Sequence, residues 1–337
     1  MSVALRILSA GPGVTVQDAG REGFLRYGVT AAGPMDRLAH ATANRAVGNA
    51  VEAAALEVSL GGLEVAVEGA PVTVAIAGGA FTPSSAGLKL PSSARLDLAP
   101  GASLSIRAGV SGAWCYLAIA GRLDLPPFLG SLSTHTRSAL GGYEGRTLAA
   151  GDAIPIAEPR ASHATPARLL TPWLDPDDRP IRVILGPQDD YFPADQIEAF
   201  RAGPWTVSPR SDRMAYRLDG PRLKHARGFN IISDGIAMGA IQVPGDGQPL
   251  ALMADRQSTG GYPKIATIIG PDVRRLAQRR PNEPFQFATV SVDEAVAARR
   301  EEARVLAAPI ESAPVIRREF PSEFLLSVNL IGGATSS

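Results

Sequence analysis

The chain has 337 residues, of which 33 are basic and 33 acidic, so its formal net charge is zero. This balance is unlike the electrostatic footprint of a protein that binds nucleic acid or an anionic membrane surface. The length favours two domains, and 35 glycines with 28 prolines favour many short strands over long helices.

The N-terminal half reads as one strand, one helix and then a series of strands. Val3–Leu8 has strand composition. Apolar residues recur at helical spacing between Pro34 and Gly48, which suit the start and end of a helix. Asp36 lies in the first turn, and a helix start explains it better than a ligand does. From residue 56 to 156 the pattern is β, with strands expected at Leu63–Val67, Val72–Ala77, Arg95–Leu98, Ser103–Arg107 and Cys115–Ala120.

The cysteine count and the N-terminus indicate the compartment. Cys115 is the only cysteine, so a disulfide framework within one chain is impossible, and we expect a buried inert thiol. The first residues, 1–6, lack a signal-peptide layout, and no apolar run reaches transmembrane length. We therefore expect a cytoplasmic protein without a membrane partner. The four histidines show no metal-ligand spacing and are expected at the surface or in turns; they are His40, His135, His163 and His225.

A stretch without clear periodicity at 157–180 marks the boundary between two β-rich units. We expect an N-terminal domain at 1–160, a linker at 161–180, a C-terminal domain at 181–306 and a tail at 307–337. In the second unit helices are expected at Asp195–Phe200 and, after a capping box, from about Val292 to Leu306. Strands are expected at Ile181–Leu185, Thr206–Ser208, Ala215–Leu218, Gly228–Ser233, Ala240–Val243, Leu250–Ala254, Ile265–Ile269 and Pro284–Val290. Strands separated by turns favour barrels or sandwiches, hence a mainly β fold with minor α content.

The polar segment between the two apolar runs 250–254 and 265–269 is the best functional candidate. As a hairpin connection it would need only a few small residues, yet it carries charges, an amide and hydroxyls. Asp255 can accept N–H bonds, Gln257 can pair with an amide, and the amides of Gly260 and Gly261 can hold an oxyanion. The sequence has no phosphate loop, HExxH or GxSxG motif, so no standard reaction is indicated.

Two further polar segments keep two interpretations each. The strand end at 186–190 fits simple turn chemistry or a binding loop. The adjacent charges Asp212 and Arg213 are either solvated, as is usual, or part of a site.

Several long strings in order along residues 10–290 carry a family resemblance. They are TVQDAGREGF (15–24), AGPMDRLAHATANRAVGN (32–49), AALEVSLGG (54–62), YLAIAGRLDLPPFLGSLST (116–134), GPQDDYF (186–192), SDRMAYRLDGP (211–221), IISDGIAMGAIQVPGDGQPLALMADRQSTGGYPKIATII (231–269) and LAQRRPNEPFQF (276–287). With these strings the chain resembles the biotin-dependent carboxyltransferase family, also called allophanate hydrolase subunit 2-like, which includes the C subunit of 5-oxoprolinase.

The resemblance implies two cyclophilin-like β-barrel domains and a heteromeric enzyme. It implies one chain of a 5-oxoprolinase-like complex that opens 5-oxo-L-proline to L-glutamate with ATP hydrolysis. The implied partners are a subunit 1-type chain, which is similar to the B subunit of 5-oxoprolinase, and a chain similar to its A subunit. One alternative is biotin-dependent carboxyl transfer to urea or another amide. Biotin would then sit on a partner, since this chain has no Met-Lys attachment pair. The other is a non-enzymatic antagonist that binds a kinase-inhibitor partner.

Within that function we expect the site to combine the 255–264 segment with neighbouring strand ends. The expected catalytic residues, which accept a proton or balance negative charge, are Asp255, Asp212 and Arg256. The expected substrate-binding residues are Gln188, Arg213, Gln257, Thr259, Gly260, Gly261, Tyr262 and Lys264. No metal is expected.

Overall fold

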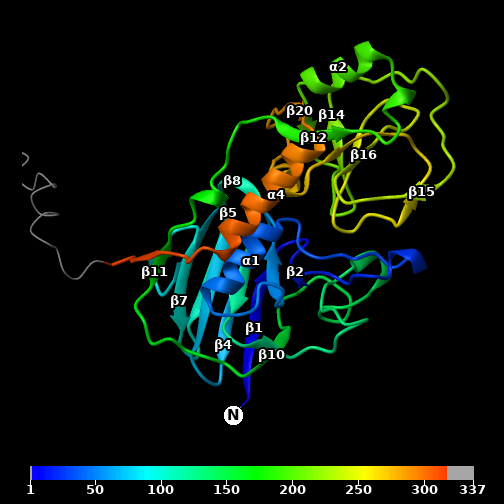
Figure 1. Ribbon diagram of the computed structural model, residues 1–337. Helices are drawn as coiled ribbons and strands as arrows, with labels where there is room; N and C mark the ends of the chain where they lie inside the picture. The colour runs from blue at the N-terminus through cyan, green and yellow to red at the C-terminus, as the bar shows by residue number, and fades with distance from the viewer. Residues whose placement is uncertain (1, 317–337) are drawn as a thin grey trace, which may run out of the picture.

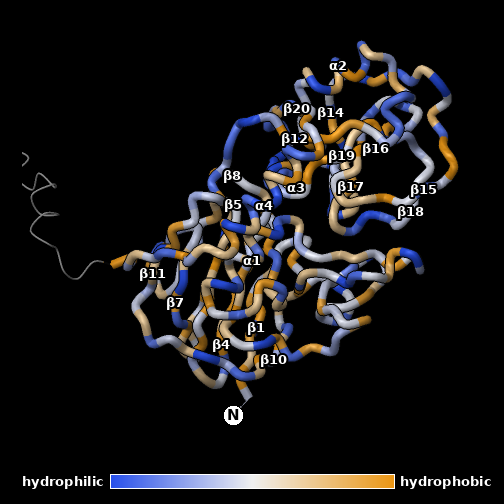
Figure 2. Tube along the Cα trace, viewed as in Figure 1, coloured by the Kyte–Doolittle hydropathy of each residue, from blue (hydrophilic) through white to orange (hydrophobic). Residues whose placement is uncertain are grey.

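The computed structural model describes residues 2–316, and two β-sheets are the main regular structure in this part of the chain (Figure 1). The larger sheet has twelve strands and the smaller has seven, so the expectation of a mainly β fold is confirmed for the described residues. A two-stranded ribbon and four α-helices complete them. Hydrophobic residues are distributed through the strands of both sheets (Figure 2). None of the helices in the described part is long and apolar enough to span a bilayer.

The larger sheet is built from residues 3–169, with β21 from near the end of the described residues added at one edge. Its strand order is β21-β11-β7-β5-β8-β4-β1-β10-β9, with β2, β3 and β6 attached beside this path. The strands are β1 (Val3–Ala10), β2 (Thr15–Gln17), β3 (Ala55–Val58), β4 (Leu63–Glu68), β5 (Val72–Ser85), β6 (Leu88–Lys89), β7 (Ala94–Leu98), β8 (Ser103–Ile119), β9 (Arg122–Leu123), β10 (Ala153–Ala157), β11 (Ala167–Leu169) and β21 (Ser312–Pro314).

The two central strands, β5 and β8, are longer than their sequence pattern suggests. Two separate strands were expected within 103–120, but β8 runs through them as one. Its pairing with β5 shifts register on either side of Ala80. Glycines make the shift possible: Gly112 has a φ of 77°, and a Cβ there would lie 2.5 Å from the Cα of Gly79. The glycines that looked like strand ends are positions where the two backbones come close together.

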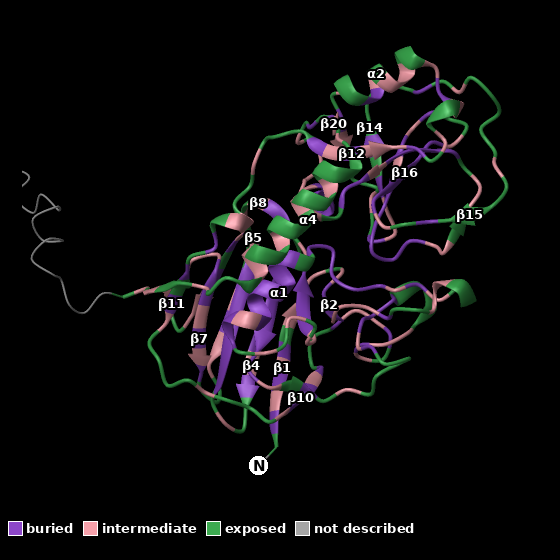
Figure 3. Cartoon of the chain, viewed as in Figure 1, coloured by how far each residue is buried: buried purple, intermediate pink, exposed green. Residues whose placement is uncertain are grey.

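Both faces are buried where Val72–Ala77 of β5 lies beside Ala113–Ile119 of β8, and Figure 3 shows purple strands at the centre of this sheet. One face, with Ile76 and Leu117, packs into the interior of the larger sheet. The other carries small side chains such as Ala75 and Ala77, and α1 (Arg37–Ala46) packs on it. Asp36 is the N-cap of α1 and accepts a hydrogen bond from Ala39 N at 2.9 Å, so its interpretation as a helix start is confirmed.

The smaller sheet has the order β13-β14-β17-β16-β19-β12-β20, antiparallel except where β12 pairs with β20. Its strands are β12 (Ile181–Leu185), β13 (Thr206–Val207), β14 (Ala215–Asp219), β16 (Ala240–Gln242), β17 (Leu250–Leu252), β19 (Lys264–Ile268) and β20 (Phe287–Thr289). The ribbon pairs β15 (Asp234–Gly235) with β18 (Thr259–Gly260), and the remaining helices are α2 (Ala194–Ala202), α3 (Gly270–Ala277) and α4 (Val292–Ala307). Short 3-10 turns, η1 to η4, occupy Leu25–Tyr27, Thr136–Ser138, Pro172–Leu174 and Asp189–Tyr191.

Two local expectations in this half are wrong, and one helix lies where no element was predicted. No strand forms at 228–233, whose backbone only connects to the ribbon. Helix α3 was not expected, although Pro271 in its first turn is a usual start signal. The strands on either side of the 255–263 segment do not form a hairpin, because β17 and β19 each pair with β16, which lies between them. The segment therefore crosses over one strand.

The two sheets share a hydrophobic core that contains residues of α1, β5 and β8 together with residues of the smaller sheet and α3. Gln278, just after α3, accepts hydrogen bonds from Ala113 N and Trp114 N and donates to Asp36 at 2.8 Å. Strand β11 lies in the expected linker and β21 in the expected tail, and they pair with each other at the edge of the larger sheet. Residues 317–337 of the expected tail lie outside the described residues, and the domain division stays a prediction.

Candidate functional site

A buried network of opposite charges lies where the two sheets meet. Arg213 precedes β14 and Asp255 follows β17, and the pairing of these strands brings them together. The Arg213 guanidinium donates from Nε and Nη2 to the two carboxylate oxygens of Asp255, each at 3.0 Å. Its Nη1 donates to Glu57 of β3, and its Nη2 also donates to Gly33 O at 2.7 Å. One arginine thus joins the smaller sheet to two segments of the N-terminal half.

Glu57 is completely buried and is fixed by several donors. Its Oε2 accepts from Met35 N at 2.8 Å and from the Tyr116 hydroxyl at 2.7 Å. Burial raises the pKa of Glu57, and the positive charge of Arg213 opposes this. Burial alone would lower the pKa of Arg213, but the charges of Asp255 and Glu57 outweigh it and hold that pKa above its ordinary value. One guanidinium faces two carboxylates, and neutral donors such as the Tyr116 hydroxyl satisfy the remaining acceptor atom of Glu57, so the network fixes the relative positions of these segments.

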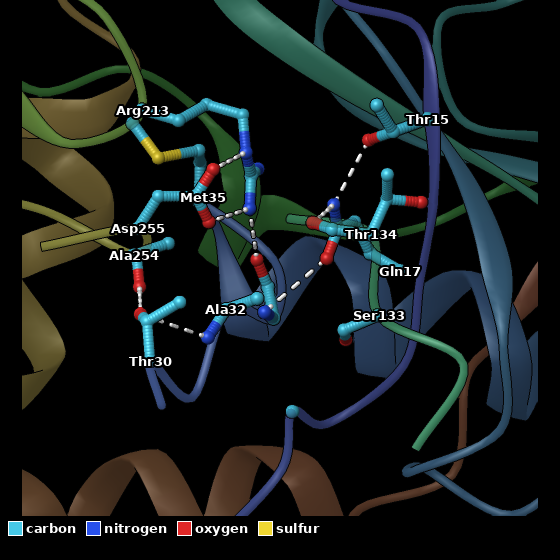
Figure 4. Close-up of polar contacts among 12 residues, drawn as sticks. Thr15, Gln17, Thr30, Ala32, Met35, Ser133, Thr134, Arg213, Ala254 and Asp255 are labelled. Atoms are coloured by element: carbon cyan, nitrogen blue, oxygen red, sulfur yellow. Dashed lines mark hydrogen bonds and ion pairs between the residues drawn. The ribbon is translucent and has the colours of Figure 1, made fainter. Parts of the chain in front are cut away.

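Figure 4 shows how this network continues into the N-terminal half. Gly33 N donates to Gln17 Oε1 at 3.2 Å, and Gln17 Nε2 donates to Thr134 O at 3.1 Å. Below Asp255 in the figure, the Thr30 hydroxyl lies 3.5 Å from Ala254 O. The Gly-rich segment after β2 and the loop before η2 therefore line the same junction as the segment after β17.

Two buried side chains at this junction each keep one polar atom without a hydrogen-bond partner in the described residues. Arg21 donates from Nη2 to Ser133 O at 2.6 Å, while its Nη1 has no acceptor. His135 is buried and its Nδ1 has no partner. Burial lowers the pKa of His135, and the charges of Asp255, Arg213 and Arg21 are close enough to act on it. Buried polar atoms are nearly always paired, so these two mark a place for water or a ligand.

Arg256 is a second buried arginine without an ion pair in the described residues; unlike Arg21, it has no carboxylate acting on its charge. It is 7% exposed, and its Nε donates to Ile236 O at 3.1 Å. Within residues 2–316 no carboxylate forms an ion pair with it. Burial, together with the nearby charge of Arg37, lowers the pKa of Arg256 to about 10. A buried cation without a counter-charge can stabilise negative charge on a bound molecule.

Lys264 and Gln188 form a separate group with the ribbon. Lys264 is buried, and its Nζ donates to Asp234 Oδ2 at 2.6 Å. Its main-chain N donates to Gln188 Oε1 at 3.2 Å, which fixes the loop after β12. Because Asp234 already compensates its charge, Lys264 is a less suitable partner for an anion than Arg256 is.

A cavity of about 350 Å³ lies on the smaller sheet beside the charged network. Asp212, Gln257 and Tyr262 line it. Asp212 is exposed, and its Oδ2 accepts from Arg137 at 2.7 Å across the junction. Gln257 Oε1 is buried there with no donor in the described part of the chain. The volume is within the range of small-molecule sites.

The expected site residues therefore fall into three neighbouring groups. Arg213 and Asp255 belong to the buried network, so Arg213 is not solvated, whereas the solvated interpretation fits Asp212. Gln257, Tyr262 and Asp212 line the cavity, and Gln188 and Lys264 lie beside the ribbon. The ribbon itself contains Thr259, which is exposed, and Gly260, while Gly261 follows and accepts from Ile231 N at 2.8 Å.

Sequence reasoning missed Glu57 and Tyr116, treated Arg21 as part of a polar turn, and placed His40 wrongly. His40 is buried inside a helix, whereas His135 is buried but lies in a loop at the start of a 3-10 turn. A lone carboxylate inside the apolar strand β3 was the one available signal for Glu57. Tyr116 gives no such signal, because tyrosine is common in strands.

The chain is similar to several known proteins. A family model described as "Carboxyltransferase domain, subdomain A and B" matches residues 27–289. The chain is 38% identical to the C subunit of 5-oxoprolinase from Escherichia coli over 309 residues, which cover 89% of this chain and 96% of that protein. It is 33% identical to the C subunit of 5-oxoprolinase from Haemophilus influenzae over 87% of this chain and 94% of that protein.

A solved structure with the same fold is urea amidolyase of Kluyveromyces lactis. The TM-score is 0.83 at 29% identity, covering 90% of this chain. The chain spans only 20% of the length of that urea amidolyase, in contrast to nearly the whole length of the two 5-oxoprolinase chains.

Proposed function

Because the chain belongs to the carboxyltransferase domain family with subdomains A and B and is a homologue of the 5-oxoprolinase C subunit, we propose that it is the corresponding chain of a heteromeric 5-oxoprolinase. The observation that carries the proposal is coverage: the match takes in 96% of the Escherichia coli chain. The proposed reaction is the ATP-dependent opening of 5-oxo-L-proline to L-glutamate. The proposal includes two cyclophilin-like β-barrels, a cytoplasmic location, and two partners that correspond to the A and B subunits. ATP use belongs to the complex.

The chemistry of lactam opening suits the charged junction. Water adds to the ring carbonyl carbon, the C–N bond breaks, and the nitrogen leaves with a proton. Negative charge develops on the carbonyl oxygen during the addition. Arg256 is a buried cation one residue before the cavity-lining Gln257 and outside the lining itself, so it can stabilise this charge through its electric field without a direct hydrogen bond. Asp255 holds Arg213 in place, and Asp212 at the cavity rim is the more accessible carboxylate for accepting a proton.

Reconstitution tests this function. The full chain is combined with its A-type and B-type partners, and glutamate is measured with 5-oxoproline and ATP present. We expect glutamate only when this chain, both partners and ATP are all included. A complete mixture that associates but forms no glutamate, or a mixture that forms it equally well without this chain, would contradict the proposal.

Carboxyl transfer is the second candidate, favoured by the likeness to urea amidolyase. In that function biotin would be carried by another domain, and the acceptor would be urea or a related amide. Calorimetry with free biotin separates the two, since carboxyl transfer requires a biotin site on this chain. Association with a partner without turnover of lactam or urea would instead favour the antagonist function.

A further inference from the structure

The floor of the cavity on the smaller sheet is formed by residues that lie opposite one another on the neighbouring strands β14, β17 and β16. Arg217 of β14 lies opposite Leu250 of β17, and Leu250 lies opposite Gln242 of β16. The next row pairs Ala215 with Leu252. All of these residues line the cavity. Neighbouring strands are about 4.8 Å apart, so the Cα atoms of Arg217 and Gln242 are about 10 Å apart, with an apolar floor between them.

One side of this floor presents amide groups. Gln242 is 1% exposed, and its Nε2 lies 3.4 Å from Tyr262 O, which is a weak hydrogen bond. Gln257 Oε1 is buried, and within residues 2–316 no donor reaches it. A buried acceptor without a donor costs free energy that a ligand N–H would recover.

The opposite side presents guanidinium groups. Arg137, Arg210 and Arg217 all line the cavity and are exposed at its rim. Arg137 is paired with Asp212. Neither Arg210 nor Arg217 forms an ion pair within the described residues, which leaves both free to bind a carboxylate.

We propose that this cavity binds the acceptor as a carboxylated lactam. The apolar ring carbons lie over Leu250 and Leu252, the lactam N–H donates to Gln257 Oε1, and Gln242 Nε2 donates to the lactam carbonyl. The carboxylate binds Arg217 at the rim. This assignment rests on the proposed function and adds to it a reason for the choice of substrate: Arg217 selects for the carboxylate, while the two glutamines select for the lactam group.

The test is calorimetric binding of two probes, 5-oxoproline and 2-pyrrolidone, to the full chain assembled with its partners. The second probe has the lactam but lacks the carboxylate. We expect the wild type to bind 5-oxoproline at least tenfold more tightly. Arg217→Met should remove this preference to within twofold, because hydrogen bonds to a charged group are worth about ten- to a hundredfold in affinity.

The amide side gives a different result in the same experiment. Gln257→Leu should weaken both probes by a similar factor, about five- to tenfold, because both contain the lactam N–H. Arg222→Met, an exposed arginine outside the cavity lining, is the matched control and should change neither affinity. Arg217→Met should thus weaken the binding of 5-oxoproline alone, whereas Gln257→Leu should weaken the binding of both probes. A general loss of folding would not produce this difference between the variants.

Two results would overturn the cavity assignment: a wild-type complex that binds neither probe, or an Arg217→Met variant that keeps the preference for 5-oxoproline. Both are independent of turnover. If the complex forms glutamate but its affinities for the two probes do not change in Arg217→Met and Gln257→Leu, the proposed function remains supported and the substrate binds elsewhere. If both probes bind as expected but no glutamate forms, the cavity assignment remains supported and the proposed function is contradicted.

Discussion

Arg213 is the residue on which the junction between the two sheets most depends. It is buried and compensates two carboxylates, Asp255 and Glu57, from different halves of the chain. Arg213→Met should therefore lower the free energy of unfolding by about 3–5 kcal/mol, because it leaves two buried charges unpaired. Denaturant unfolding measures this.

The matched control is the second ion pair that crosses the junction, between Arg137 and Asp212, which is exposed. Arg137→Met should cost no more than about 1 kcal/mol in unfolding free energy. Equal costs for the two variants would show that the buried network does not hold the junction together.

His40 predicts how stability depends on pH. It is buried in α1 with its Nε2 3.2 Å from Gln17 O, and burial lowers its pKa from 6.5 to about 4. Between these values the unfolded chain binds a proton that the folded chain does not. The stabilisation is thus complete above pH 6.5 and lost as the pH falls to about 4, a change of about 3 kcal/mol. In His40→Gln, the free energy of unfolding should fall less than in the wild type as the pH is lowered from 6.5 to about 4. The same dependence of unfolding free energy on pH in the variant and the wild type would contradict this assignment.

The absence of a side chain at Gly260 leaves room for the side-chain amide of Gln242, which lines the cavity. A Cβ at Gly260 would lie 2.6 Å from Gln242 Nε2 and 2.7 Å from the Cδ1 of Ile236. Both atoms end flexible side chains, so Gly260→Ala should change the melting temperature little while weakening 5-oxoproline binding several-fold. Gly228→Ala, where a Cβ meets nothing within 4 Å, should leave both unchanged. Wild-type affinity in Gly260→Ala would show that Gln242 does not contact the substrate.

At the residue scale the sequence pointed to the 255–264 segment as the site, which stays a prediction, and it could not show the contacts that its members make. Asp255 was expected to act on the substrate, yet both of its oxygens accept from Arg213. Partners such as Glu57 and Arg21 come from segments more than a hundred residues away, and no local pattern reveals such contacts.

Among the elements, the crossing of β5 and β8 depends most on single residues. Gly112 and Gly87 have nearly equal φ values, 77° and 78°, but only Gly112 faces a backbone, that of Gly79. Gly87→Ala should lower the free energy of unfolding by about 1 kcal/mol, because alanine is strained in a left-handed backbone conformation. Gly112→Ala should lower the free energy of unfolding by about 1–3 kcal/mol more than that, since its Cβ also forces β5 and β8 apart. Thermal unfolding of the two variants compares them directly, and equal costs would show that the close approach does not matter.

Elements with strong local signals could be predicted from the sequence, and those defined by pairing could not. The capping box of Ser291 and Glu294 indicated α4 correctly. In contrast, β17 and β19 looked like the arms of a hairpin because they follow one another closely. Only the register of the sheet shows β16 between them.

For the whole molecule, the shared core predicts cooperative unfolding. Residues of α1 and β8 pack in the same cluster as residues of the smaller sheet, and Trp114 donates from its indole N–H to the Tyr216 hydroxyl at 3.0 Å. Calorimetry should give one transition that coincides with the loss of β-structure in circular dichroism. Two separate transitions would show that the sheets unfold independently.

At this scale composition and strand spacing were sufficient for a mainly β fold, and the long collinear strings were sufficient for the family. The arrangement of the sheets was not accessible, because β11 and β21 come from segments that looked like a linker and a tail but pair at one edge. Such short edge strands have too few residues to show a period.

The central claim is that an uncompensated cation at the junction serves the reaction, and Arg256→Gln tests it most directly. Since Arg256 forms no ion pair in the described residues and burial disfavours its charge, the variant should keep or exceed the wild-type melting temperature. Its rate of glutamate formation in the reconstituted complex should fall about a hundredfold or more. A well-folded Arg256→Gln complex with a rate within twofold of the wild type would contradict the claim.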